Sequence, residues 1–353
     1  MIVHIFILSC ILILGSVFDF SVPKQRKAFI IWSSVLLVLI SGLRNMYIGP
    51  DDTYTYYREY IDFKSMSYYD VFASYKDPLF CLLTKLIGEM TSYNFTAFLL
   101  IIGILFMAPI GYFIYKYSPY PLLSIVLLLS LGFYDAQMVI IRQSAAIAIS
   151  SFVYIFLKDK KYVLAIIAVL IATCFHLTAI LLLFVGFIAL KKIDKKMIAI
   201  YLLTIIVVAI FSNTISEYLK AYMTISDRLA GYSEADSTLS MSGFVQLVLI
   251  SLYVFMNYKG TIRKYPDAII SINMLVIALL FQSLVIVSAE FFRVAWYFKY
   301  FLILLLPQVV KATGNKNSKS IVYLLFIVYY LYSIRGLDYA FFWEKYIPSF
   351  NPW

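Results

Sequence analysis

Apolar runs recur along the whole sequence and reach the length of a membrane-crossing helix. Clear examples are Ala28–Gly42, Phe95–Tyr115, Ala268–Ser288 and Val294–Val310, which approach the roughly 20 residues that a helix needs to cross the hydrocarbon layer. Of the 353 residues, 63% are hydrophobic and only 14% are charged. A water-soluble fold could not be covered by so few polar groups, so the sequence predicts an all-α polytopic membrane protein.

The chain is predicted to form one integral membrane domain over residues 1–353, because no extended polar segment separates the apolar runs. Met1–Phe18 lacks the basic leading region and the cleavage site of a secretion signal, and we expect it to form the first helix. The cysteines Cys10, Cys81 and Cys174 show neither a disulfide framework nor a metal-binding spacing. We expect no metal and no cofactor.

Clusters of lysine and arginine predict the orientation of the chain. Seventeen of the 29 basic residues lie in six short clusters, which are Lys24–Lys27, Lys116, Lys158–Lys161, Lys191–Lys196, Lys259–Lys264 and Lys311–Lys319. Short basic loops stay on the cytoplasmic side. The two long polar connections, Arg44–Pro78 and Asn213–Met241, each carry a net charge of −2, as expected for loops that face outward. The scattered clusters also argue against nucleic acid as a partner, since they form no contiguous basic face.

Keeping every lysine cluster on one side predicts about 10–12 transmembrane helices, some short or broken, with an external loop or re-entrant region at 44–94. A narrow external turn is expected over Tyr134–Gln143. Tyr162–Leu190 is long for one crossing and short for two, so we predict two short helices that meet near His176. Pro78–Met90 is either an interfacial or re-entrant segment or an amphipathic covering helix.

This topology gathers polar groups on the outer face, where ionisable residues at membrane depth indicate function. They are Arg44, Asp51, Asp52, Asp135, Arg142, Gln143, His176, Arg228, Glu290, Arg293 and Arg335. Asp51 or Asp52 could accept a proton from a sugar hydroxyl, and tyrosines beside them could stack on a pyranose. The alternative is a solvated turn that caps a helix beginning near Thr53.

Three arginines and one histidine suggest chemistry beyond topology. Arg142, Arg293 and Arg335 suit a diphosphate, because the planar guanidinium donates two hydrogen bonds and stays charged. Each arginine could instead extend to the membrane interface without binding a ligand. His176 could act as a general base or bind a phosphate, and the alternative is a buried histidine satisfied by a carbonyl.

Four motifs follow one another over roughly residues 42 to 307. They are Gly42-Leu-Arg44 with Ile48-Gly-Pro-Asp51-Asp52-Thr53 and Tyr56; Ile141-Arg142-Gln143-Ser144-Ala145-Ala146-Ile147-Ala148; Cys174-Phe175-His176-Leu177-Thr178-Ala179; and Arg293-Val-Ala-Trp-Tyr297-Phe298 followed by Pro307. This ordered set resembles the EpsG-like, Wzy-type polymerases of bacterial surface polysaccharides, whether O-antigen, capsule or exopolysaccharide. The doubled Asp51–Asp52 leaves open which carboxylate corresponds to the single aspartate of that family.

The resemblance implies a metal-independent glycosyltransferase on the outer face of the bacterial cytoplasmic membrane, facing the periplasm or exterior. It would move a glycan from a polyprenyl-diphosphate carrier onto a lipid-linked repeat unit. The implied partners are the polyprenyl-diphosphate-linked oligosaccharide, membrane lipid and a chain-length-regulating membrane protein. The implied substrate contacts are Arg44, Tyr56, Arg142, Gln143, Arg293, Tyr297 and Arg335, and the implied base is Asp51, Asp52 or His176. A transporter or flippase of lipid-linked oligosaccharide, and a ligase that uses the same donor, are the alternatives.

Overall fold

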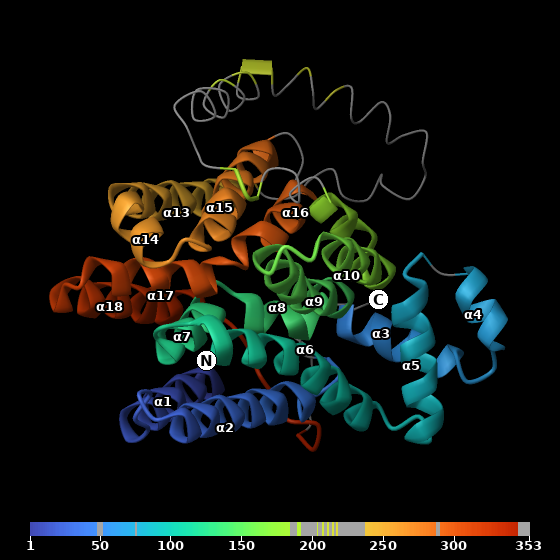
Figure 1. The fold of residues 1–353 in the computed structure, drawn as a ribbon. Helices are drawn as coiled ribbons and strands as arrows, with labels where there is room; N and C mark the ends of the chain where they lie inside the picture. The colour runs from blue at the N-terminus through green and yellow to red at the C-terminus, as the bar shows by residue number, and fades with distance from the viewer. Residues whose placement is uncertain are drawn as a thin grey trace. The chain divides into compact units, whose positions relative to one another are not determined.

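The computed structural model describes residues 1–47, 52–74, 76–183, 189–191, 237–286 and 290–344, with six isolated positions between 191 and 237. The described residues are built from α-helices, and the β-bridge between Arg44 and Phe341 is isolated. The chain divides into two compact units, whose helices are labelled in Figure 1. Unit 1 holds residues 1–156, 163–180 and 314–353, and unit 2 holds residues 157–162 and 181–313.

Unit 1 carries most of the helices that the apolar runs predict. Its helices are α1 (Ile2–Val17), α2 (Pro23–Gly42), α3 (Asp52–Asp62), α4 (Tyr68–Ser74), α5 (Pro78–Met90), α6 (Phe95–Tyr117), α7 (Pro121–Ser130), α8 (Phe133–Val139), most of α9 (Ile141–Lys158), α10 (Tyr162–Phe175) and α18 (Lys316–Ser333). Proline stands in the first turn of α2, α5 and α7, where its missing amide hydrogen leaves no helical bond unmade.

Helices α2 and α6 pack closely and antiparallel in unit 1. A Cβ atom on Gly42 would lie 2.9 Å from the backbone Cα of Leu100, and one on Gly111 would lie 3.2 Å from Ile30. Residues late in α2 therefore face the start of α6, and residues early in α2 face its end. Small residues at such contacts let two membrane helices approach without a polar interface.

The expected turn over Tyr134–Gln143 is largely helical. Helices α7 and α8 meet at a bend of 48°, where Gly132 has a φ of +81°. That left-handed conformation is readily adopted by glycine and strained for other residues. The chain turns again at Ile140, between α8 and α9, so the return is made by a short helix and a one-residue break.

The polar connection over Arg44–Pro78 also contains helices, α3 and α4. The expected helix start near Thr53 is confirmed. The segment after α18 returns to the end of α2, where the amide of Asn45 donates to the carbonyl of Ala340 at 2.8 Å and the amide of Phe342 donates to that of Leu43 at 2.9 Å. The end of α2 is thereby fixed on one side by the C-terminal segment.

Unit 2 consists of α13 (Ser237–Met256), α14 (Tyr258–Lys264), α15 (Ala268–Ser283), α16 (Glu290–Lys299) and α17 (Leu302–Thr313), with a short 3-10 turn at Leu284–Ile286. The apolar run Val294–Val310 does not form one straight helix. It breaks between α16 and α17, which bend by 44°. The run Ala268–Ser288 is confirmed as helical up to Ser283.

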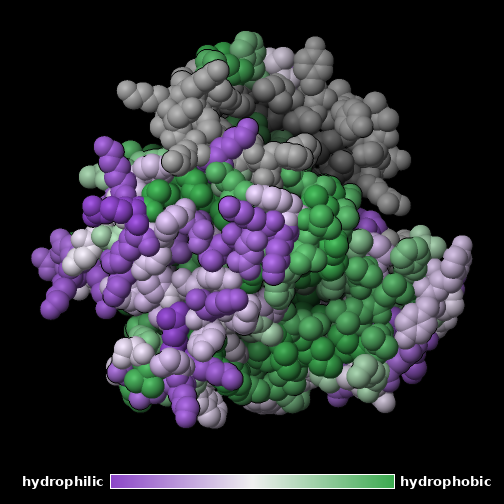
Figure 2. Space-filling model, viewed as in Figure 1, coloured by the Kyte–Doolittle hydropathy of each residue, from purple (hydrophilic) through white to green (hydrophobic). Residues whose placement is uncertain are grey.

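The helices have the length and composition of a polytopic membrane protein. In the described residues, α2 and α6 are each long and apolar enough to cross a bilayer, and three bent pairs would each supply a further span. Shorter apolar helices are α1, α10 and α15. Figure 2 shows hydrophobic side chains over α6 and α10, as expected for surfaces that contact lipid. The protein is embedded in the membrane, and the number of crossings stays a prediction.

Candidate functional site

Arg142 lies at the start of α9 and joins two carboxylates from different elements of unit 1. Its Nη1 donates to Oδ2 of Asp77 at 3.1 Å, and its Nη2 donates to Oε2 of Glu59. The side chain of Asp77 is only 1% exposed, that of Arg142 is 11% exposed and that of Glu59 is 23% exposed. Of the two carboxylates that contact Arg142, Asp77 is therefore nearly buried, whereas Glu59 lies nearer to the surface.

His176 completes this cluster. Its Nδ1 lies 3.9 Å from Oδ2 of Asp77, and its side chain is 20% exposed. Helix α10 ends at Phe175, directly before it, so the predicted break near His176 is confirmed. We call Glu59, Asp77, Arg142 and His176 the charged cluster.

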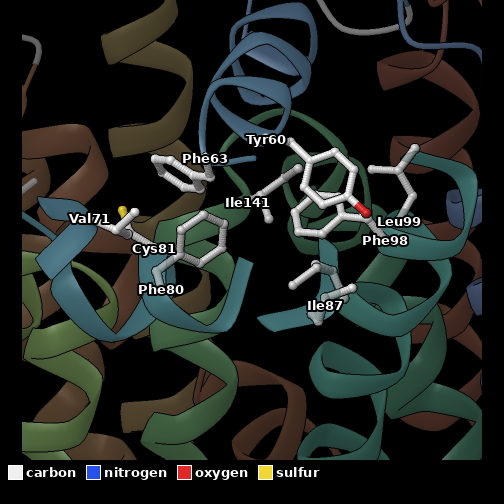
Figure 3. Close-up of a cluster of buried hydrophobic side chains, with 10 residues drawn as sticks. Tyr60, Phe63, Val71, Phe80, Cys81, Ile87, Phe98, Leu99 and Ile141 are labelled. Carbon is white, nitrogen blue, oxygen red and sulfur yellow. The ribbon is translucent and has the colours of Figure 1, made fainter. Parts of the chain in front are cut away.

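The charged cluster rests on aromatic and aliphatic side chains. The guanidinium carbon of Arg142 lies 5.6 Å from the ring centre of Tyr56 and 5.3 Å from that of Phe80, distances at which a cation is attracted to the ring. Phe80 also belongs to a buried hydrophobic cluster with Tyr60, Phe98 and Ile141 (Figure 3). These ring contacts, together with the two carboxylates, hold the guanidinium in one orientation.

The electrostatics keep Asp77 ionised. Burial alone raises the pKa of this carboxyl, but the interactions with His176 and Arg142, of which only Arg142 is within hydrogen-bond distance, outweigh burial and lower the pKa below its usual value. Asp77 also precedes Pro78 at the N-terminus of α5, where the helix dipole favours a negative charge. Its Oδ1 is buried and accepts no hydrogen bond from the described residues. An ionised carboxylate with one unused oxygen can orient a histidine and accept a hydrogen bond from one more donor.

Arg44 is buried and fixes the elements around the charged cluster. Its guanidinium donates to the carbonyl of Ser41 and, at 3.0 Å, to that of Met138. The hydroxyl of Thr53 donates to the same Met138 carbonyl at 2.9 Å. Arg44 therefore joins the end of α2 to the end of α8 and, through this shared carbonyl, to the start of α3, which carries Tyr56 and Glu59.

Three tyrosines, two of which share helix α3 with Tyr56, form a row of neighbouring rings. The rings of Tyr47 and Tyr54 are stacked with centres 5.7 Å apart, and those of Tyr54 and Tyr57 are 6.2 Å apart. Tyr57 also meets Phe95 edge to face at 5.2 Å. Tyr47 is exposed, and Tyr54 and Tyr57 are half-buried. We call Tyr47, Tyr54 and Tyr57 the tyrosine row.

The structure brings together Tyr56, Arg142 and His176 from the predicted set, and Gln143 follows Arg142 as a buried neighbour. Arg335 is exposed beyond the end of α18, with its guanidinium 5.3 Å from the ring of Tyr332. Arg293 and Tyr297 lie in α16 of unit 2, Arg293 half-buried and Tyr297 buried. Several predicted groups fall outside the described residues: Asp51, Arg228 and the side chains of Asp52 and Glu290. Asp135 pairs with His4, at 3.3 Å from its Nε2.

Sequence reasoning did not single out Glu59 or Asp77. Two signals could have found them. Glu59 lies three residues after Tyr56, which places both on one face of a helix. Asp77 precedes a proline that begins an apolar helix, an arrangement typical of a helix N-terminus.

Within the described part of the chain, no group of three or more histidine, cysteine, aspartate or glutamate side chains could hold a metal ion. The family described as the EpsG family matches residues 27–348. A search of curated proteins and a search of solved structures each found no match. The family match covers nearly the whole chain, including both units and the charged cluster.

Proposed function

We propose, from the premise that this chain belongs to the EpsG family, that it is the polymerase of a polysaccharide repeat unit. The family implies a polymerase-like membrane protein of polysaccharide biosynthesis. The finer proposal is that the protein transfers the growing glycan from a polyprenyl-diphosphate carrier to a lipid-linked repeat unit. The reaction takes place on the outer face of the bacterial cytoplasmic membrane, and residues 1–353 act as one integral membrane domain.

The observation that carries the proposal is the pairing of His176 with Asp77. Asp77 faces Nδ1 of His176 at 3.9 Å and is almost fully buried, whereas the imidazole is partly exposed. A carboxylate at Nδ1 favours the tautomer with a proton on that nitrogen, which leaves Nε2 free to accept another. The lowered pKa of Asp77 suits it to stabilise an imidazolium and not to act as the base itself. His176 is therefore the proposed general base.

The proposed reaction is a direct displacement. The acceptor hydroxyl oxygen bonds to the anomeric carbon of the donor sugar while the bond from that carbon to the diphosphate oxygen breaks. The electron pair of the broken bond leaves with the polyprenyl diphosphate, and the hydroxyl proton moves to Nε2 of His176. Asp51 and Asp52, which follow Gly49-Pro50 in the sequence, remain the other proposed bases.

Arg142 is proposed as a positioning residue of this site. Both terminal nitrogens of its guanidinium already contact carboxylates, and Nε is without a hydrogen-bond partner among the described residues. A diphosphate on Arg142 would have to use Nε or displace a carboxylate. Arg293 and Arg335 are the proposed diphosphate contacts, since cationic groups stabilise the charge that develops on the departing diphosphate.

The tyrosine row is proposed to contact the acceptor glycan. Tyrosine faces provide apolar surface for a sugar ring, and the hydroxyls provide hydrogen bonds. Two members of the row, Tyr54 and Tyr57, lie on α3, which also supplies Tyr56 and Glu59.

Elongation by the purified protein tests this function. The protein would be placed in lipid nanodiscs with a lipid-linked repeat unit, and the lipid-linked products separated by size. A polymerase gives a ladder of longer lipid-linked glycans and releases polyprenyl diphosphate. A ligase gives a single transfer to another acceptor, and a transporter forms no new glycosidic bond. Absence of a ladder from folded protein with its native repeat unit would show that the proposal is wrong.

A further inference from the structure

An apolar groove of about 560 Å³ runs along the pair of helices α2 and α6 in unit 1. On α2 its lining extends from Lys27 to Leu39, and on α6 it extends from Leu100 to Tyr115. Small side chains, among them Ala108 and Ser34, leave space between the larger aliphatic ones. The proposed polymerase chemistry assigns no role to this groove.

The two ends of the groove differ in charge. Lys27, Tyr112 and Tyr115 line one end, whereas Leu39 and Leu100 line the other. Lys27 is exposed and forms no ion pair with any described residue. Two neighbouring cations are already engaged, because Arg26 donates to the carbonyl of Ser118 at 2.6 Å and Lys116 donates to the hydroxyl of Tyr112 at 3.1 Å. Lys27 is therefore available for an anion at the mouth of an apolar groove.

The length of the groove fits one lipid chain from one leaflet. Leu39 lies twelve residues after Lys27, a distance of about 18 Å along α2 at roughly 1.5 Å per residue. Half of the hydrocarbon layer is about 15 Å thick. A chain whose head group lies at Lys27 would therefore reach the bilayer midplane and little further. Among the described lining residues, a lipid whose anionic head lay at the opposite end would meet the aliphatic side chains of Leu39 and Leu100 and no cation.

We propose that this groove binds an anionic phospholipid from the leaflet at the lysine-bearing ends of α2 and α6. One acyl chain lies along the groove, and the phosphate lies beside Lys27. Tyrosines at that end match the aromatic belt at a membrane interface, and a lysine near the surface attracts anionic lipid. This site is distinct from the charged cluster and does not depend on the proposed function.

Native mass spectrometry of the purified full-length protein tests the site. The detergent-solubilised protein would be titrated with phosphatidylglycerol and, separately, with phosphatidylcholine that carries the same acyl chains. We expect one retained phosphatidylglycerol in preference to phosphatidylcholine. Lys27→Gln should reduce that preference about fivefold, the effect expected of one lysine near an anionic lipid. Lys64→Gln, in the connection between α3 and α4, is the charge control and should leave it unchanged.

Filling the groove gives an independent readout. Ala108→Phe should abolish the retained lipid of either kind, whereas Leu105→Phe, on an exposed part of α6 outside the groove, should not. Equal retention of both lipids by the unmodified protein would overturn the proposal, as would unchanged preference in Lys27→Gln. Displacement of the bound phosphatidylglycerol by equimolar polyprenyl phosphate would identify a carrier-lipid site and also overturn it. Because Lys27 is exposed, the Lys27→Gln result holds even if Ala108→Phe does not fold.

Discussion

Replacing Arg142 with glutamine should destabilise the protein strongly, because this guanidinium contacts both Asp77 and Glu59. The carboxylate of Asp77 is 1% exposed, so it would stay buried without its cation. Removing one partner of a buried ion pair costs about 3–5 kcal/mol. Glu59 is 23% exposed and can reach water, so it adds less. We expect the free energy of unfolding to fall by about 3–5 kcal/mol, mainly through Asp77.

Equilibrium unfolding in mixed detergent micelles, followed by tryptophan fluorescence, measures this loss. Asp77→Asn removes the charge that Arg142 neutralises, so the double variant should lose about 0.5–3 kcal/mol less than the sum of the single variants. The matched control is Arg335→Gln, an exposed arginine whose loss should change stability by less than about 0.5 kcal/mol. If Arg142→Gln is as mild as this control, or if the two substitutions are additive, the buried ion pair does not stabilise the fold.

Three further predictions concern the glycan contact, the helix packing and the response to acid. Tyr57→Ala should raise the KM for the acceptor about threefold to tenfold and leave kcat nearly unchanged, whereas Tyr69→Ala, a 77% exposed tyrosine of α4, should change neither in the elongation assay. Gly42→Ala should lower the unfolding free energy by about 1–3 kcal/mol, because its Cβ would lie 2.9 Å from the backbone of α6; Gly260→Ala, in helix α14 with nothing within 4 Å, should not lower it, because alanine favours a helix more than glycine does. The pKa of Asp77 is lowered in the folded protein, so its ionised form stabilises the fold above the unfolded pKa of about 3.9, and this contribution is lost as pH falls through the lower folded pKa. The stability difference between the unmodified protein and Asp77→Asn should therefore shrink as the pH falls below about pH 4; a difference that stays unchanged down to about pH 2 would contradict a stabilising role of the ionised carboxylate.

Hydropathy predicted the helices well where one helix is both long and apolar. Phe95–Tyr115 corresponds to α6, and Pro78–Met90 corresponds to α5. For α5 the proline at its start also marks the boundary, because proline suits the first turn of a helix. The family resemblance, drawn from four ordered motifs, is confirmed by the match over residues 27–348.

Bends were harder to predict than lengths. Hydropathy measures how much apolar chain is present and says nothing of its direction, so Val294–Val310 read as one span although the chain breaks after Lys299. The break near His176 was predicted because the run Tyr162–Leu190 has the wrong length for one or two crossings. The rule that short basic loops stay on the cytoplasmic side predicted this break, which hydropathy alone does not predict.

The site was predicted in part for a similar reason. Arg142 and His176 stood out because a charged or titratable side chain in an apolar stretch is costly. Their partners did not stand out, since Asp77 and Glu59 lie in a segment with many charges. Arg142 meets Asp77 across 65 residues of sequence and Glu59 across 83, and such pairings depend on how the helices pack. Only the folded chain shows which of the carboxylates faces the arginine.

The turnover of His176→Gln tests the central claim most directly. The single-turnover rate of elongation would be measured in nanodiscs at saturating lipid-linked repeat unit, beside the unmodified protein. Glutamine keeps a polar side chain of similar reach but cannot take up the proton, and loss of a general base lowers the rate by about 100-fold to 10,000-fold. We predict a loss in this range, with folding and acceptor binding retained. A rate within a few fold of the unmodified protein would contradict the assignment of His176 as the base.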